Sequence, residues 1–172
     1  MMGLTTIISG EGGTPVPAGG AAGYFRGLEQ NGISVDFGTH YSATQAREAV
    51  LGMASRAPTP AELDRMRALV DTAMRAGALG ITTALIYPPS SYHTTEELVE
   101  LARVAGRHGG LYASHIRGEG KELLTSIAEA ITIGEQGGTA VEIFHLKAAY
   151  QPGWGTLMPQ AGALIEAARQ RG

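Results

Sequence analysis

Two histidines hold equivalent places in consecutive strand–helix units of the sequence. His115 ends one short apolar run, and His145 ends the next run, one unit later. The C-terminal ends of parallel strands open on one face of an α/β fold, where ligands bind, so both imidazoles should face the same site. Neutral imidazole suits zinc and its neighbours in the transition series. The pair predicts a metal site; the alternative is that each is a buried histidine held by a backbone carbonyl.

A carboxylate follows the first expected strand. Glu11 lies in the glycine-rich stretch from Ser9 to Gly13, on the face where the two histidines should open, and it could supply an anionic third ligand. The alternative is a solvated glutamate in a loop. The same glycines do not predict phosphate binding, because the lysine and hydroxyl residue of a P-loop and the GxGxxG spacing are missing.

Three further side chains should lie near this site. Tyr87 ends the strand that precedes His115, and Arg117 and Lys147 each come two residues after one of the histidines. A cation there can bind a substrate carboxylate or balance a carboxylate of the site. For Arg117 the alternative is an ion pair with Glu119 or with another carboxylate of the fold.

The remaining histidines and the single tryptophan give weaker signals. His40 follows a tentative strand, so a role in the site stays open. His93 and His108 flank a helix, and we expect both at the surface. We expect Trp154 to pack within its loop.

Strands alternate with helices along the chain, most clearly from Pro58 onward. Two capping boxes, at Thr59–Glu62 and Thr94–Glu97, each begin a helix with apolar residues on one face, and glycines end these helices. The sequence predicts strands over residues 3–9, 33–37, 78–86, 111–115 and 141–145, helices over 43–53, 59–77, 94–109, 121–136 and 156–171, and a loop over 11–23.

This alternation predicts an α/β fold with parallel strands and crossover helices. No linker interrupts residues 1–172, so we expect a single domain. About five strands are enough for an open doubly wound sheet, the competing architecture, but a (β/α)8 barrel needs eight strands and about 250 residues. A barrel would therefore be incomplete here, with unpaired strand edges that favour self-association.

Composition excludes several classes of function. The chain is 44% hydrophobic and 17% charged, which is enough apolar material for a core. Its net charge is −3 and its sequence contains no basic stripe, so nucleic acid is not an expected partner. No apolar run is long enough to cross a membrane, and residues 1–13 lack the features of a secretory signal. The absence of cysteine excludes disulfides and is compatible with the reducing cytoplasm, where we expect the protein.

Four stretches together carry a resemblance to a known family. From about Met53 to the C-terminus, and more loosely over the first strand, the sequence resembles the N-acyl-D-amino-acid deacylases of the amidohydrolase superfamily. The resemblance rests on a strand followed by tyrosine and proline, a capped helix, a strand-end His-x-Arg and a His-x-Lys one unit later; these stretches are residues 80–89, 94–98, 111–117 and 144–147.

The resemblance implies metal-dependent hydrolysis of the amide bond of N-acyl-D-amino acids, on a segment of a (β/α)8 barrel. It implies that His115 and His145 bind zinc, with one or two ions in the intact enzyme. It also implies that Tyr87 and Lys147 contact the substrate, and that Lys147 binds the carboxylate of the acylated amino acid. The bridging ligand of the family is often cysteine. Glu11 is the candidate for that role here, and a shift by one residue would place Gly12 there instead.

Two departures from the family pattern bear on activity. The His-x-His pair of the first barrel strand is absent, and the general-base aspartate of the last strand would lie beyond residue 172. The chain would then span about strands 2 to 5 or 6, and we expect it alone to bind metal with little or no turnover. Two other functions remain open: a non-catalytic α/β domain that binds a small molecule or partner, and another amidohydrolase, hydantoinase-like or a dipeptidase.

Overall fold

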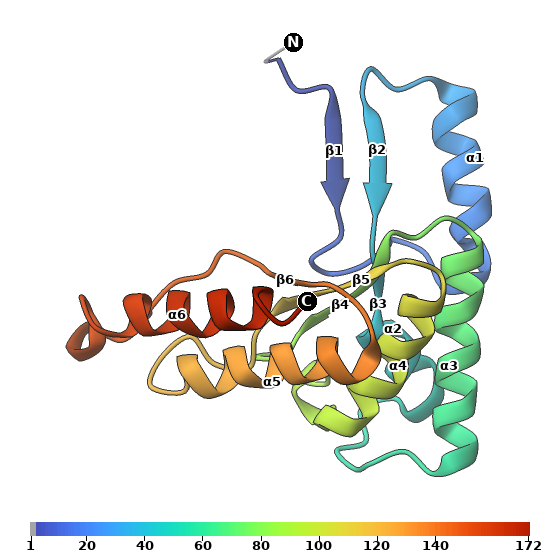
Figure 1. The fold of residues 1–172 in the computed structure, drawn as a ribbon. Helices are drawn as coiled ribbons and strands as arrows, with labels where there is room; N and C mark the ends of the chain where they lie inside the picture. Colours follow the sequence, from blue (N-terminus) through green and yellow to red (C-terminus); the bar gives the residue numbers. More distant parts are fainter. Residues whose placement is uncertain (1–2) are drawn as a thin grey trace.

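Parallel strands and crossover helices make up the fold of the computed structural model, which describes residues 3–172 (Figure 1). The first two residues of the stretch 1–13 lie outside this range. The strands are β1 (Thr6–Ser9), β2 (Asp36–Thr39), β3 (Tyr41–Ser42), β4 (Gly80–Ala84), β5 (Leu111–His115) and β6 (Val141–Ile143). The helices are α1 (Ala21–Asn31), α2 (Ala43–Leu51), α3 (Pro60–Arg75), α4 (Thr95–Arg107), α5 (Leu123–Gly137) and α6 (Leu157–Arg169), with short 3-10 turns at Ala18–Gly20, Ser90–Tyr92 and Gln151–Gly153.

All strand pairs of the described chain are parallel. β1 pairs with β2, and β3, β4, β5 and β6 follow one another in a second sheet. β2 and β3 are separated only by His40, and the Leu79 amide, just before β4, donates to the Thr39 carbonyl at 2.9 Å. The strands therefore run as five successive stretches, the second of them broken at His40. This arrangement confirms the predicted α/β class.

Local capping signals placed two central helices correctly. At the start of α3, the Glu62 amide donates to Thr59 Oγ1, and the Thr59 amide donates to a Glu62 carboxylate oxygen at 2.8 Å. At the start of α4, the Glu97 amide donates to Thr94 Oγ1 at 3.2 Å, but the predicted second capping box is incomplete, because the Glu97 carboxylate binds Arg47 instead of the Thr94 amide. These bonds satisfy amide groups that have no partner within the helix, and they fix where each helix begins.

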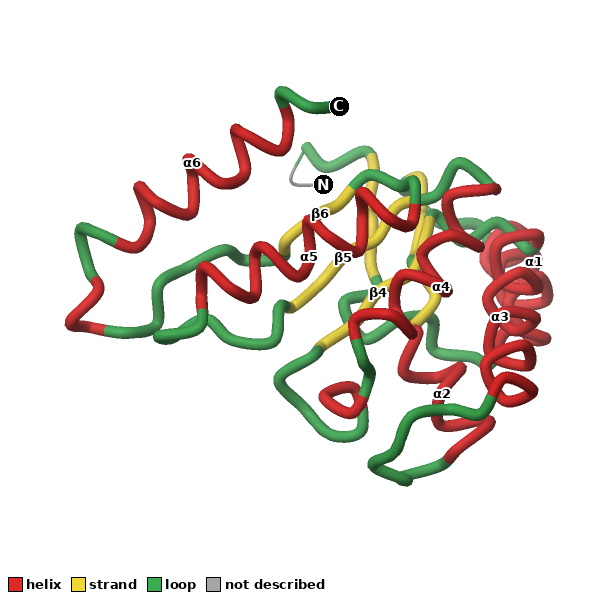
Figure 2. The backbone as a smooth tube through the Cα atoms, turned by 60° about the horizontal axis from the view of Figure 1, so that its bottom comes forward, coloured by secondary structure: helices red, strands yellow, loops and turns green. Residues whose placement is uncertain are grey.

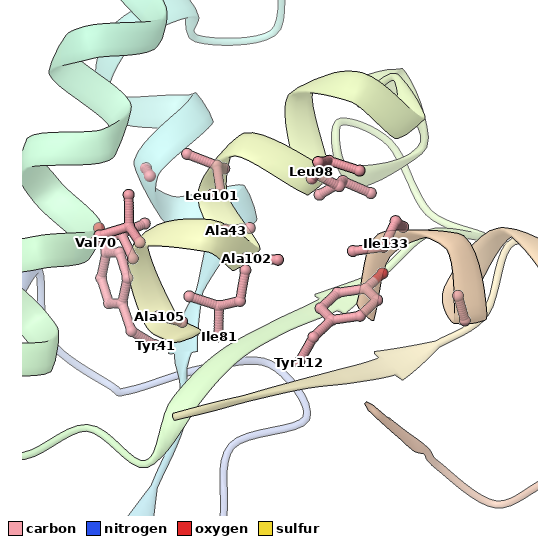
Figure 3. Packing of buried hydrophobic residues seen from close by; sticks show 14 of the residues in the cluster. Tyr41, Ala43, Val70, Ile81, Leu98, Leu101, Ala102, Ala105, Tyr112 and Ile133 are labelled. Atoms are coloured by element: carbon pink, nitrogen blue, oxygen red, sulfur yellow. The ribbon is translucent and has the colours of Figure 1, made fainter. Parts of the chain in front are cut away.

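One apolar core joins the helices to the sheet. Most of its members come from α2, α3, α4 and α5 and from one face of β3, β4 and β5. Figure 3 shows Ile81 and Tyr112, from adjacent strands, facing α4 and α5. Burial raises the pKa of the Tyr112 phenol to about 12. Its hydroxyl lies 2.9 Å from Thr83 Oγ1, so the one polar atom of this ring is satisfied inside the core.

The N-terminal part departs most from the prediction. Residues 21–31 form α1, where a loop to residue 23 and no helix were predicted, and β2 begins at Asp36 rather than at residue 33. Gly23 and Gly27 lower the helix propensity of this stretch, and only Ala21 of α1 is buried. The low propensity explains why the sequence gave no clear helix signal here.

Strands β4 and β6 are shorter than predicted. β4 ends at Ala84, and β6 ends at Ile143, so His145 lies two residues beyond its strand rather than at its end. His145 adopts a φ of 38°, a conformation that is uncommon for a residue with a side chain. This turn, and not the strand, sets the direction of the imidazole.

The last helix, α6, lies beside α5, on the side away from α4 (Figure 2). Ala161 is its only fully buried residue in the described chain. Between α5, α6 and the outer edge of β6 runs an apolar groove of about 780 Å³, lined in part by Ile131, Val141 and Ile165. No helix within residues 3–172 is both long and apolar enough to span a bilayer.

Candidate metal centre

Three side chains from separate strand ends converge on one point. Glu11 lies in the turn after β1, His115 is the last residue of β5, and His145 follows β6. Because all these strands are parallel, their C-terminal ends lie on the same side, as the sequence predicted. One ligand atom from each side chain lies within 4.8 Å of the others.

The two imidazoles share one carboxylate oxygen. Glu11 Oε1 lies 3.1 Å from His115 Nδ1 and 3.0 Å from His145 Nε2, and the two rings stand nearly perpendicular with centroids 4.5 Å apart. The hydrogen bond from His145 is the largest cause of a lowered pKa for the Glu11 carboxyl, reinforced by His115 and opposed by partial burial. Glu11 is thus an anion facing two nitrogen donors.

The donor set fits a zinc ion. Zinc takes imidazole nitrogen and carboxylate oxygen at roughly 2.0–2.2 Å and commonly uses three protein ligands when it keeps a fourth position open. Atoms within 4.8 Å of one another can share one such ion after small side-chain rotations. His115 is buried and His145 more open, so a ligand in the fourth position could reach solvent.

The turn that carries Glu11 depends on glycine. Gly10 has a φ of 105°, and a Cβ there would lie 2.5 Å from Thr39 Oγ1 and 2.9 Å from the His40 amide. Gly12, on the other side of Glu11, has open space around the same position. The fold therefore requires glycine at Gly10 and not at Gly12.

We expect Gly10→Ala to lower the free energy of unfolding by about 1–3 kcal/mol, because the strained turn has to shift. The same shift should move Glu11 and weaken zinc binding. Chemical denaturation and a zinc titration measure the two effects, and Gly12→Ala is the matched control. Equal behaviour of the two variants would contradict the close approach at Gly10.

A second carboxylate, Glu119, lies on the other side of the imidazoles. Its Oε1 is 3.0 Å from His145 Nδ1 and contacts Lys147 Nζ, and its Oε2 is 3.8 Å from His115 Nε2. Sequence reasoning considered Glu119 only as a partner of Arg117. The signal that could have found it is the pair of opposite charges that follow two adjacent parallel strands.

Tyr87 and Lys147 lie at this site, as predicted. The Tyr87 ring is 5.6 Å from the His115 ring, and its side chain is largely exposed. Lys147 is half exposed, with its ammonium group beside Glu119 and 3.0 Å from His145 Nδ1. Both side chains are therefore open to a ligand from solvent.

Arg117 is engaged elsewhere. Its guanidinium donates to both carboxylate oxygens of Glu129 on α5, at 2.9 and 2.8 Å, and to the carbonyls of Ser91 and His93. The expected ion pair exists, but its partner is Glu129 and not Glu119. All three guanidinium nitrogens of Arg117 donate hydrogen bonds. Arg117 therefore holds the segment between β4 and α4, which contains Tyr87, against α5.

Two other histidines, His40 and His93, are buried, and for His93 this contradicts the expected surface position. His93 is buried and not at the surface, with Nδ1 2.7 Å from Glu97 Oε1. His40 is also buried, and burial lowers the pKa of its imidazole. It lines a cavity of about 340 Å³ that reaches Glu11.

The two other residues with weak signals lie at the surface. His108 pairs with Asp71 at 2.8 Å, as expected for a surface histidine. The Trp154 ring is 65% exposed rather than packed, and only its indole N–H is held, by the Ala148 carbonyl.

Several known proteins are similar to this chain in both sequence and fold. A D-aminoacylase from Alcaligenes xylosoxydans xylosoxydans is 37% identical over 150 residues, which are 87% of this chain and 31% of that protein. A solved D-aminoacylase, described as defining a novel subset of amidohydrolases, superposes with a TM-score of 0.88 at 29% identity over 98% of this chain and 40% of that one. No family model matches the chain.

A second solved relative carries a ligand. The N-acyl-D-glutamate deacylase of Bordetella bronchiseptica, in complex with zinc and a phosphonate that mimics the tetrahedral intermediate, superposes with a TM-score of 0.87 at 28% identity. It matches 99% of this chain and 40% of that structure. The chain thus spans about a third of the curated relative and two fifths of the solved ones. Over this span the chain is similar in both sequence and fold to N-acyl-D-amino-acid deacylases, D-aminoacylase among them.

Proposed function

We propose that this chain forms the metal-binding part of an enzyme that hydrolyses the amide bond of N-acyl-D-amino acids. The observation that carries the proposal is the convergence of Glu11, His115 and His145 from three strand ends. The kinship with D-aminoacylase favours this reaction over a hydantoinase-like or dipeptidase activity and over a non-catalytic binding domain.

Glu11, His115 and His145 would hold a zinc ion, with the carboxylate balancing part of its charge. When bound, such an ion supplies Lewis-acid polarisation of the scissile carbonyl and lowers the pKa of a water molecule. The general base would be an aspartate outside residues 1–172.

Lys147 and Tyr87 would orient the substrate. The half-exposed ammonium of Lys147 would bind the carboxylate of the N-acyl amino acid. A charge-assisted hydrogen bond of this kind fixes the position of the substrate and selects a negatively charged group. Tyr87 would line the entrance beside His115. Holding the substrate in one geometry lowers the entropic part of the barrier.

The sheet would continue into a (β/α)8 barrel, with residues 1–172 as one domain that supplies its second to fifth or sixth strands. The outer edge of β6 and the apolar groove beside it would receive the next strand and helix. Alone, the chain would bind metal, turn over little substrate and self-associate through this edge.

The test is release of free amine from N-acetyl-D-amino acids and from their L isomers. We expect hydrolysis of the D series by a polypeptide that joins this chain to the remaining barrel strands, and little by the zinc-loaded chain alone. A complete barrel that hydrolyses none of the D series, or only the L series, would refute the proposal.

Lys147→Ala in that longer polypeptide should lower kcat/KM. A hydrogen bond between charged groups is worth about 1.5–3 kcal/mol, which corresponds to roughly 10- to 100-fold in kcat/KM. The loss should be far smaller for an N-acyl amine that lacks the carboxylate. Lys121→Ala is the control, because Lys121 lies over the Tyr150 ring rather than at Glu11. Equal losses on both substrates would exclude Lys147 from carboxylate binding.

A further inference from the structure

Glu119 is a carboxylate that its neighbours almost enclose. Its side chain is 10% exposed, in the loop between β5 and α5. Its own backbone carbonyl accepts the Ala149 amide at 2.7 Å, so this loop is tied to the segment that follows β6. A carboxylate held this deeply requires partners that offset its loss of hydration.

Those partners are His145 and Lys147, both proposed members of the site. Glu119 Oε1 lies 3.0 Å from His145 Nδ1 and contacts Lys147 Nζ. On the opposite edge of the same ring, His145 Nε2 lies 3.0 Å from Glu11. The imidazole of His145 is therefore held between two carboxylates.

The proton on His145 decides which nitrogen can bind a metal. Lys147 Nζ also lies 3.0 Å from Nδ1, so Nδ1 could accept from the ammonium or donate to Glu119. If Nδ1 accepted, the proton would sit on Nε2 and close the metal-facing nitrogen. Without a metal, Nε2 can hold that proton and donate it to Glu11, 3.0 Å away. Once a metal binds Nε2, the proton must lie on Nδ1, where Glu119 can accept it.

We propose that Glu119 is a positioning residue that accepts the Nδ1 proton of His145 when a metal occupies Nε2, and that holds the ammonium of Lys147 beside this ring. Metal-bound histidines usually donate their other ring N–H to a carboxylate or carbonyl, which fixes ring orientation and tautomer. One carboxylate would thus align a metal ligand and the cation that receives the substrate. This inference rests on the proposed function, because that function makes the site a metal site. The contacts that support it lie within the chain.

The first readout is the tautomer of His145 in the zinc-loaded chain, at about pH 8, where free imidazole is neutral. Long-range nitrogen–proton NMR spectra of the ring distinguish a proton on Nδ1 from one on Nε2. We expect zinc-bound His145 with Nδ1–H in the wild type and in Glu119→Gln, which retains an oxygen acceptor, and a smaller population of this form in Glu119→Ala, where zinc should bind more weakly. A wild-type His145 with its proton on Nε2 would overturn the proposal, whatever the variants do.

The second readout is zinc affinity by competition with a chelator. Glu119→Ala should weaken it by about 10- to 100-fold, the range found when such outer partners are removed, and Glu119→Gln should weaken it less. Glu48→Ala, an exposed glutamate of α2, is the control and should bind as the wild type does. Unchanged affinity in Glu119→Ala would refute the role of Glu119 while the zinc site stands. A wild type that binds no zinc would refute the metal site itself, which is a different outcome from an unchanged affinity in Glu119→Ala.

Discussion

Replacing both His115 and His145 by alanine should abolish stoichiometric zinc binding. The wild-type chain should take up about one zinc ion, as three nitrogen and oxygen ligands with an open fourth position predict. In the double variant only Glu11 remains, and an exposed single carboxylate does not retain zinc against a chelator. Elemental analysis after stripping with chelator and reloading with zinc measures the change.

Stability gives an independent measure of the same loss. A ligand that binds only the folded state stabilises it by about 4 kcal/mol when its free concentration is a thousand times Kd. Zinc should therefore raise the Tm of the wild type and leave the double variant unchanged. His108→Ala is the control, because His108 pairs with Asp71 at the surface. A double variant that still binds zinc would exclude these histidines as ligands.

Replacing Glu97 by alanine should cost about 3–5 kcal/mol of folding free energy, because it leaves a buried charge without a partner. Arg47 is completely buried, and its Nη1 donates to both Glu97 oxygens at 2.9 Å, while its Nη2 donates to the carbonyls of Ala54 and Arg56. His93 completes the cluster at 2.7 Å. Chemical denaturation at neutral pH measures the loss, and the exposed Glu96→Ala, on the same helical turn, is the control.

The pH dependence of this loss follows from the direction of the Glu97 pKa shift. Burial opposes ionisation, but the hydrogen bond and charge of His93, together with Arg47, outweigh it and lower the pKa. A lowered carboxyl pKa contributes stability above the unfolded value, about 4.3, and the contribution disappears as the pH falls through the folded value. The difference between wild type and Glu97→Ala should therefore shrink in acid. A difference that stays constant down to pH 3, or one below about 1 kcal/mol at neutral pH, would contradict this account.

The part of the fold from α3 onward was predictable because local and long-range signals agree there. Thr59 and Thr94 cap helices whose apolar faces are buried, and Gly109 and Gly138 have the positive φ that ends a helix. By contrast, α1 buries a single residue, and Gly23 and Gly27 lower its helix propensity. Tyr24 of α1 packs edge-on against Phe37 of β2, a contact that the spacing within the helix does not reveal.

The candidate site was predictable in its members but not in its connections. Equivalent places after parallel strands brought Glu11, His115 and His145 together, because topology fixes where strand ends lie. Sequence spacing could not tell which carboxylate Arg117 would choose, since Glu119 is nearer in sequence but Glu129 is the partner. Similarly, His93 is buried beside Glu97, and the other partner of Glu97, Arg47, lies far away in the chain.

The most direct test of the central claim is a crystal structure of the zinc-loaded chain, with diffraction recorded on both sides of the zinc absorption edge. We predict one strong anomalous peak, bonded to the side chains of Glu11, His115 and His145. A peak at any other group of residues, or no peak in a chain whose three side chains lie as described, would contradict the assignment of this site.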